Sequence, residues 1–108
     1  MTDKIVVLVT CGSLEEGRTI ARTLVERRLA ACVNMVAGLE SVYRWKDAVE
    51  EASECLLLAK TTRAGFEPLR SAVRELHSYE LPEIVALPIV DGLEAYLRWI
   101  AASVESVE

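Results

Sequence analysis

The chain's only histidine, His77, stands in the stretch RELHSYELPEIVALP, where two carboxylates follow it at regular spacing. Glu80 lies three residues after His77, and Glu83 lies three residues after Glu80. On a helix this spacing would align the side chains, and across a turn into a strand they could still converge. Imidazole and carboxylate suit Cu(II) or Zn(II), and such sites rank copper above its first-row neighbours. The spacing therefore predicts a divalent-metal site; the alternative is that His77 ends a helix and the carboxylates are solvated.

The three cysteines, Cys11, Cys32 and Cys55, lie about twenty residues apart and form no C-x-x-C pair. Neither a structural zinc site nor a thioredoxin-like motif is therefore indicated. Their odd number, with no secretory signal, indicates a reducing compartment, and we expect the cytoplasm. Cys32 and Cys55 sit in apolar runs typical of a core, whereas a thiolate from Cys11 would make the metal site softer.

A second candidate site lies where a predicted strand ends and a helix begins, at Lys60, Thr61 and Thr62. A helix N-terminus with hydroxyls and a lysine can hold an anion. No glycine-rich phosphate loop accompanies these residues, and a threonine that simply caps the helix explains them as well. Four aromatic residues could line a ligand-binding cleft between subunits or pack in an interface: Tyr43, Trp45, Tyr79 and Trp99.

Catalysis has little support in the sequence. Cys11 and His77 could form a nucleophile and base pair, but the chain has no second histidine and no G-x-S-x-G motif. Acylphosphatase-type chemistry would require an arginine in the loop after the first strand, and TCGSLEEG has none before Arg18. We therefore expect a protein that is not an enzyme.

Length and charge exclude several classes of protein. The 108 residues fit one domain, 1–108, and the apolar fraction of 52% supplies a modest core. A net charge of −5 without a Lys/Arg stripe would repel phosphate backbones, so nucleic acid is not an expected partner. No apolar run approaches the ~20 residues that span a bilayer, so we expect no membrane segment.

Hydrophobic periodicity predicts an alternation of strands and helices. Ser13 followed by Glu16 is a capping-box signature for the first helix, and Asp91 with Glu94 repeats it for the last. Gly38 predicts a bulge or bend in the second strand. The predicted strands lie at 4–10, 30–45, 55–59 and 83–90, and the predicted helices follow Ser13, begin near Gly65 and cover 93–104.

The order β-α-β-β-α-β, followed by a helix, predicts an α+β fold of the ferredoxin-like class, with a four-stranded antiparallel sheet and two helices on one face. The second and third strands form a long hairpin around the turn KDAV, and each arm could exceed ten residues. Usual strands have about 5–6 residues, and long open edges must be covered or paired. The hairpin alone therefore predicts a homo-oligomer.

Four segments in register, RLAACVNMVAGLESVYRWKD, LLLAKTT, LHSYELPEIVALPI and YLRWI, resemble the CutA family of divalent-cation-tolerance proteins. The similarity extends from about Ile5 to Ile100. It implies a ferredoxin-like fold in a tight homotrimer whose hairpins continue the sheets of neighbouring subunits. It also implies a link to copper and other divalent ions, and a likeness to PII-like signalling proteins.

Two positions depart from the family pattern. The family usually has proline after the histidine, where this chain has Ser78, and serine leaves the turn less restricted. Some members carry a cysteine in the first strand that joins the metal-binding histidine; Val9 occupies that position here and Cys11 lies two residues on.

We therefore predict a non-catalytic, cytoplasmic homotrimer that weakly binds copper or other divalent cations at His77, Glu80, Glu83 and Cys11, with a role in metal tolerance or response. The alternative is a PII-like module whose intersubunit cleft binds a small anion or nucleotide through Lys60, Tyr79 and neighbouring groups. A third class is a trimeric scaffold that presents loops to a protein partner.

Overall fold

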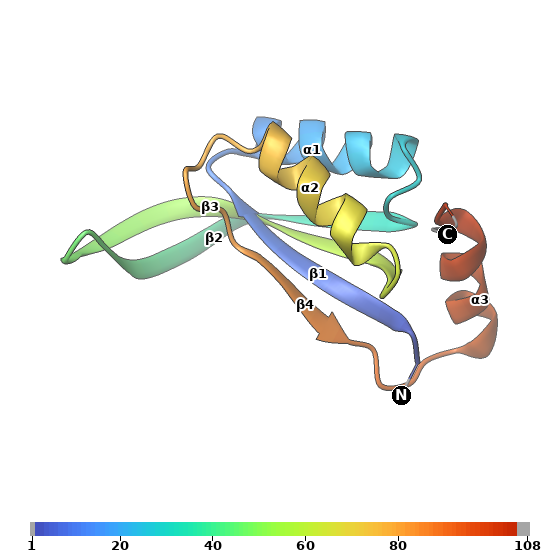
Figure 1. Cartoon of the computed structure of the whole chain (residues 1–108). Helices are drawn as coiled ribbons and strands as arrows, with labels where there is room; N and C mark the ends of the chain where they lie inside the picture. Colours follow the sequence, from blue (N-terminus) through green and yellow to red (C-terminus); the bar gives the residue numbers. More distant parts are fainter. Residues whose placement is uncertain (1, 106–108) are drawn as a thin grey trace.

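Four strands form one antiparallel sheet in the order β2-β3-β1-β4 in the computed structural model, which describes residues 2–105. Helices α1 and α2 cover one face of this sheet, and α3 packs at its end (Figure 1). The predicted α+β class and the predicted order of elements are confirmed. The elements are β1 (Lys4–Cys11), α1 (Leu14–Glu26), β2 (Cys32–Trp45), β3 (Ala48–Thr62), α2 (Phe66–Leu76), β4 (Ile84–Pro88) and α3 (Glu94–Ser103).

The core lies between the sheet and the first two helices. Successive strand side chains point to opposite faces, and in β1 the alternation buries Val7 and Val9 completely. From α1, Leu24 fills the same layer, and from α2, Leu69 and Val73 do so. All five side chains are fully buried, so this layer supplies the main hydrophobic stabilisation of the fold.

The helix starts follow the predicted caps only in part. Ser13 Oγ accepts a hydrogen bond from the Glu16 N–H at 3.1 Å, as a capping serine should. The Glu16 side chain does not complete a capping box, because its carboxylate accepts from the Ser78 N–H instead. The predicted cap at Asp91 is wrong: α3 begins with Leu93 as its N-cap, and Asp91 accepts from the adjacent Gly92 N–H.

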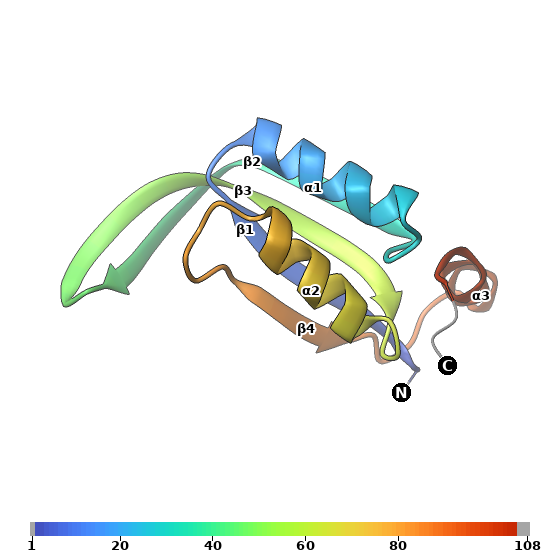
Figure 2. The same ribbon diagram turned by 45° about the horizontal axis from the view of Figure 1, so that its top comes forward.

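The β2–β3 hairpin projects beyond the two covering helices (Figure 2). Its arms have 14 and 15 residues, which confirms the predicted long hairpin. The register shifts between Val36 and Leu39, and Gly38 has a φ of +76°, a left-handed conformation that glycine adopts without steric cost. The predicted bulge is therefore present. Lys46 and Asp47, with φ of 50° and 67°, make the predicted turn.

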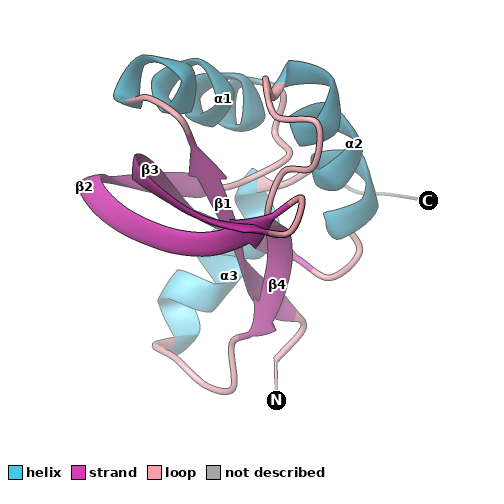
Figure 3. Cartoon of the chain, turned by 90° about the vertical axis from the view of Figure 1, so that its left-hand side faces the viewer, coloured by secondary structure: helices cyan, strands magenta, loops and turns pink. Residues whose placement is uncertain are grey.

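The second face of the sheet carries apolar side chains that none of the helices within residues 2–105 covers along its length. Val36, Val85 and Leu87 remain 44%, 46% and 49% exposed. Figure 3 shows α1 and α2 on one side of the sheet and α3 on the other, behind one end. There, Ile100 and Val104 pack on Ala31, outside the main core. Within residues 2–105, no helix is long and apolar enough to cross a membrane.

Candidate functional site

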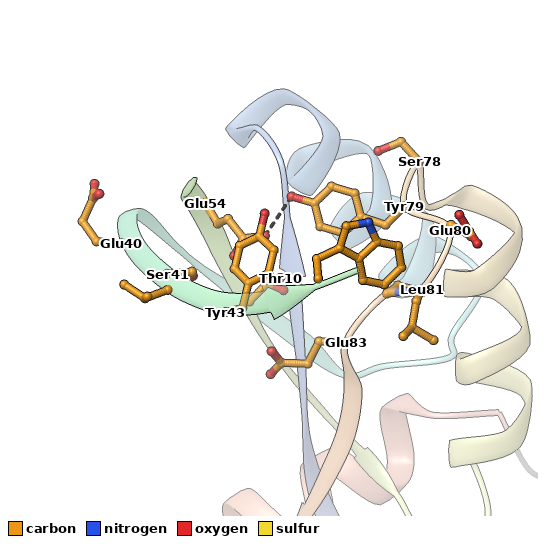
Figure 4. Close-up of a pocket in the computed structure, with 13 residues that line it drawn as sticks. Thr10, Glu40, Ser41, Tyr43, Glu54, Ser78, Tyr79, Glu80, Leu81 and Glu83 are labelled. Carbon is orange, nitrogen blue, oxygen red and sulfur yellow. Dashed lines mark hydrogen bonds between the residues drawn. The ribbon is translucent and has the colours of Figure 1, made fainter. Parts of the chain in front are cut away.

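A groove of about 930 Å³ lies between the β2–β3 hairpin and the segment 78–83 that joins α2 to β4 (Figure 4). The hairpin supplies one wall, because residues 41, 43 and 45 of β2 share one face of the strand, as the alternation predicts. The second wall is irregular backbone with Pro82 in it. The groove is lined by Thr10, Glu40, Ser41, Val42, Tyr43, Trp45, Glu54, Ser78, Tyr79, Glu80, Leu81, Pro82 and Glu83.

The groove is acidic. Four of its lining residues are glutamates, and none is a lysine, arginine or histidine. Within residues 2–105, none of the four glutamates takes part in an ion pair. Figure 4 shows the Glu83 carboxylate on the side of Tyr43, whereas Glu80 points away from that ring. Uncompensated carboxylates in a hollow raise the local concentration of cations.

His77 ends α2 and is held behind the groove. Its N–H donates to the Val73 carbonyl, and its ring is fully buried. The ring Nδ1 accepts from the Tyr79 N–H at 3.0 Å, so Nε2 carries the proton and donates to the Thr10 carbonyl at 2.7 Å. Both nitrogens are thus engaged, and a metal ion could reach Nδ1 only if the Tyr79 hydrogen bond opened.

Glu16 of α1 anchors the start of the segment 78–83. Its Oε2 accepts from the Ser78 N–H at 2.7 Å and lies 3.7 Å from His77 Nδ1. Burial by itself would raise the pKa of Glu16, but the hydrogen bonds that it accepts from Ser78 hold that pKa below its ordinary value. Serine at position 78 is therefore structurally important, because its backbone N–H donates to Glu16 and a proline there would have no N–H to donate.

Tyr79 connects the second wall of the groove to β3. Its phenol donates to Glu54 Oε2 at 2.8 Å, and its ring lies 4.7 Å from the His77 ring. Burial, together with the Glu54 carboxylate, raises the pKa of Tyr79. A Cβ at Gly12 would come within 3.2 Å of the Tyr79 oxygen, so glycine permits this close approach.

Cys11 lies in the core, paired in register with Cys55 across β1 and β3. Burial, with a contribution from Glu16, raises the pKa of the Cys11 thiol to about 12. The thiol is therefore protonated at neutral pH, a form that is neither a good metal ligand nor a nucleophile.

The structure gathers half of the predicted site residues and separates the others. Five line the groove: Tyr43, Trp45, Tyr79, Glu80 and Glu83. Across residues 2–105, no group of three or more His, Cys, Asp or Glu side chains is arranged to hold a metal ion. The four predicted metal ligands are thus divided, with two in the groove and two buried behind it.

Three residues predicted to share the ligand cleft lie elsewhere in the chain. Lys60 hydrogen-bonds to Asn34 on the neighbouring strand, and Thr61 is buried, where its hydroxyl donates to the Leu29 carbonyl at 2.8 Å. Trp99 packs against Tyr96 on α3, with ring centroids 5.4 Å apart. In the single chain they make no contact with the groove.

Two glutamates that matter here were not predicted from the sequence. Glu54 reaches the groove because it pairs with Leu39 across the hairpin, a register that depends on the bulge at Gly38. The alternation of side chains along β3 predicts on which face of the sheet Glu54 lies, but it does not predict the distance between Glu54 and Tyr79. Glu16 was interpreted only as part of a helix cap.

Comparisons with known proteins agree over nearly the whole chain. Residues 5–103 match the family model described as CutA1 divalent ion tolerance protein. A divalent-cation tolerance protein CutA of Thermus thermophilus is 57% identical over 95 residues, which cover 88% of this chain and 92% of that protein. The human protein CutA is 43% identical over 99 residues; this match covers 92% of the chain but about half, 55%, of the human protein.

Solved structures show the same fold. The divalent cation tolerance protein (Cut A1) of Thermus thermophilus superposes with a TM-score of 0.93 at 53% identity, covering 94% of this chain and 99% of that one. The CutA1 structure from Oryza sativa gives a TM-score of 0.95 at 40% identity, covering 98% of this chain and 97% of that one.

Proposed function

The chain belongs to the CutA1 divalent ion tolerance protein family, and we propose on this premise that it is a non-catalytic protein that binds divalent cations. The observation that carries the proposal is the acidic groove, with four glutamates and no basic residue in its lining. Carboxylate oxygens are common ligands for divalent ions, and their negative field attracts cations before any ligand bond forms.

Copper is the ion that we expect to bind most tightly, because N/O sites favour it among the divalent first-row ions. The groove offers Glu54 and Glu83 directly. Recruitment of His77 would require Nδ1 to release the Tyr79 N–H, and recruitment of Cys11 would require a thiol with a pKa of about 12 to ionise. Both costs favour weak binding over a dedicated metal centre.

Two observations support a protein without catalytic activity. The only histidine uses both ring nitrogens in internal hydrogen bonds, so it is not free to act as a base. Cys11 is buried and protonated, so it is not an activated nucleophile.

The alternative ligand, a small anion or nucleotide, is not supported by the groove. Four carboxylates would repel an anion, and Lys60 is engaged with Asn34 away from the lining residues. We therefore do not propose this function.

We further propose that this single ferredoxin-like domain assembles as a homotrimer. The uncovered sheet face, which includes Val36, Val85 and Leu87, supports an assembly that buries it. The long hairpin supports pairing with a neighbouring copy. We propose a cytoplasmic location, which is consistent with three cysteines that form no disulfide.

Titration calorimetry with Cu(II) and Zn(II) tests the proposed function. A double variant, Glu54→Gln with Glu83→Gln, should weaken Cu(II) binding at least tenfold (about 1.4 kcal/mol). Glu15→Gln with Glu75→Gln removes two exposed carboxylates, on α1 and α2, outside the groove and serves as the matched control. Equal loss in both proteins would mean that only net charge matters, and indifference of the double variant would exclude the groove.

The same titration on His77→Ala and Cys11→Ser tests the predicted participation of the two buried residues. If the groove carboxylates alone hold the ion, Cu(II) affinity changes less than about threefold in either variant. A tenfold loss in His77→Ala with unchanged folding would mean that the Tyr79 hydrogen bond opens to admit the metal.

A further inference from the structure

Aromatic rings line the groove beside its carboxylates. Tyr43, Trp45 and Tyr79 lie among the lining residues together with Glu54 and Glu83. Figure 4 shows Tyr43 and Tyr79 facing the same hollow, with Glu83 below Tyr43. A divalent metal ion gains from oxygen, nitrogen and sulfur ligands, so its binding gives no role to the three rings.

Aromatic faces and carboxylates together match one kind of ligand, an organic ammonium ion. The face of an indole or phenol ring carries negative potential and attracts a cation that lies within about 6 Å of its centroid. A methylated ammonium ion is weakly hydrated and apolar at its surface, so it also gains from the rings by burial. Carboxylates nearby balance its charge.

Trp45 already attracts an ammonium group of this chain. The Lys46 Nζ lies 5.6 Å from the centroid of the Trp45 ring. Lys46 does not line the groove, so this contact leaves the hollow itself open. The contact illustrates that one face of the Trp45 ring is accessible to a cation.

The hydrogen bond between Tyr79 and Glu54 holds an aromatic ring and a carboxylate of the groove in place together. The phenol is a neutral donor, so it holds the Glu54 carboxylate at 2.8 Å without adding a positive charge beside it. Burial and Glu54 raise the pKa of Tyr79, so the ring remains neutral over the physiological pH range. Glu54 is thereby held in place without a basic partner that would compete with a ligand.

We propose that this groove binds an organic ammonium cation of the trimethylammonium class, with Tyr43, Trp45 and Tyr79 against the methyl groups and Glu54 and Glu83 balancing the charge. The ligand class goes beyond the divalent ions of the proposed function. Its binding depends on the rings, whereas metal binding depends on the carboxylates alone.

Choline is the test ligand, and its uncharged isostere, in which a tert-butyl group replaces trimethylammonium, is the control ligand. Both are titrated into the full chain in its natural assembly and followed by calorimetry or by NMR shifts. Choline should bind at least about fivefold more tightly than the isostere, the size expected of a cation–aromatic contact. Equal affinity of the two, or no detectable binding of choline, overturns the proposal.

Trp45→Leu tests the role of the rings, and Trp99→Leu is its matched control, because Trp99 is a 45% exposed tryptophan outside the groove. Trp45→Leu should weaken choline binding at least about fivefold, and Trp99→Leu should leave it within about twofold. If Trp45→Leu fails to fold, Tyr43→Leu, on an exposed residue of the same face, replaces it. Unchanged choline affinity in the groove variant overturns the proposal.

A parallel Cu(II) titration separates this inference from the proposed function. Trp45→Leu should leave Cu(II) affinity within about twofold, because the indole is not a metal ligand. Choline binding without copper binding would reject the metal function and support the ammonium site. Copper binding without choline binding would reject the ammonium site and support the metal function.

Discussion

The part of β3 that runs from Glu54, beside the groove, to Thr61 holds polar groups differently at its two ends. At the groove end, Glu54 is partly exposed and accepts a hydrogen bond from the Tyr79 phenol, and Glu16 accepts one from the Ser78 N–H. At the other end, Thr61 is completely buried, and its neutral hydroxyl donates to the Leu29 carbonyl. The groove end therefore depends on carboxylates that titrate, whereas the Thr61 end depends on a neutral hydrogen bond that does not.

Distance along the strand explains why one ligand cleft did not form. Glu54 and Lys60 are six residues apart on the same extended strand, which places them about 20 Å from each other. Residues near Lys60 therefore cannot line the same hollow as Tyr79 within one chain. The difference between the ends indicates that the groove end carries the ligand chemistry and the Thr61 end is structural.

The largest effect is expected from His77→Ala, at the groove end. This change leaves the Thr10 carbonyl and the Tyr79 N–H without partners and removes a buried ring. We expect a loss of about 3–5 kcal/mol in the free energy of unfolding, measured by urea titration. The assembly should persist in size-exclusion chromatography with light scattering, and dissociation would mean that the site and the subunit contacts are coupled.

At the Thr61 end, Thr61→Val should lower the free energy of unfolding by about 1–3 kcal/mol, because the Leu29 carbonyl loses its hydrogen-bond donor. The loss should be the same at pH 7 and pH 3, since no charge is involved. Thr19→Val, on an exposed position of α1, is the control and should cost less than about 0.5 kcal/mol. A pH-dependent loss at Thr61 would contradict the distinction between the two ends.

Glu16→Gln should lower the free energy of unfolding by an amount that depends on pH, unlike Thr61→Val. The folded-state pKa of Glu16 is lowered, so its charge stabilises the fold above its unfolded pKa of about 4.3 and this contribution is lost as pH falls through the folded value. We expect a cost of about 1 kcal/mol at pH 7 that is smaller at pH 3. Urea unfolding at both pH values measures this loss in the free energy of unfolding. A loss of the same size in acid would mean that the substitution acts through packing and not through the charge of Glu16.

The smallest effect is expected from Tyr79→Phe, which removes only the phenol that holds Glu54. The free energy of unfolding should fall by about 1 kcal/mol or less, because Glu54 can return to water. In a Glu54→Gln background the cost should shrink further if the two groups interact directly. Independent costs that simply add would show that the hydrogen bond contributes nothing to stability.

Local patterns predicted much of the architecture. The first strand, predicted at 4–10, the bulge at Gly38 and the turn at Lys46 and Asp47 all depend on neighbouring residues, and the structure confirms them. The N-cap of α3 was mispredicted because Asp91 bonds to the adjacent Gly92 rather than to the helix. A side chain with two nearby donors cannot be assigned to one of them from spacing alone.

The sequence by itself determined the order of strands and helices, the long hairpin and the family, since these follow from periodicity and from motifs in register. Only the tertiary structure decided which polar side chains meet. Glu16, His77 and Tyr79 come together because α1, the end of α2 and β1 converge there. Two of these contacts, His77 with Thr10 and Glu16 with Ser78, join residues more than sixty positions apart, and their distances depend on how the layers pack, which no local pattern encodes.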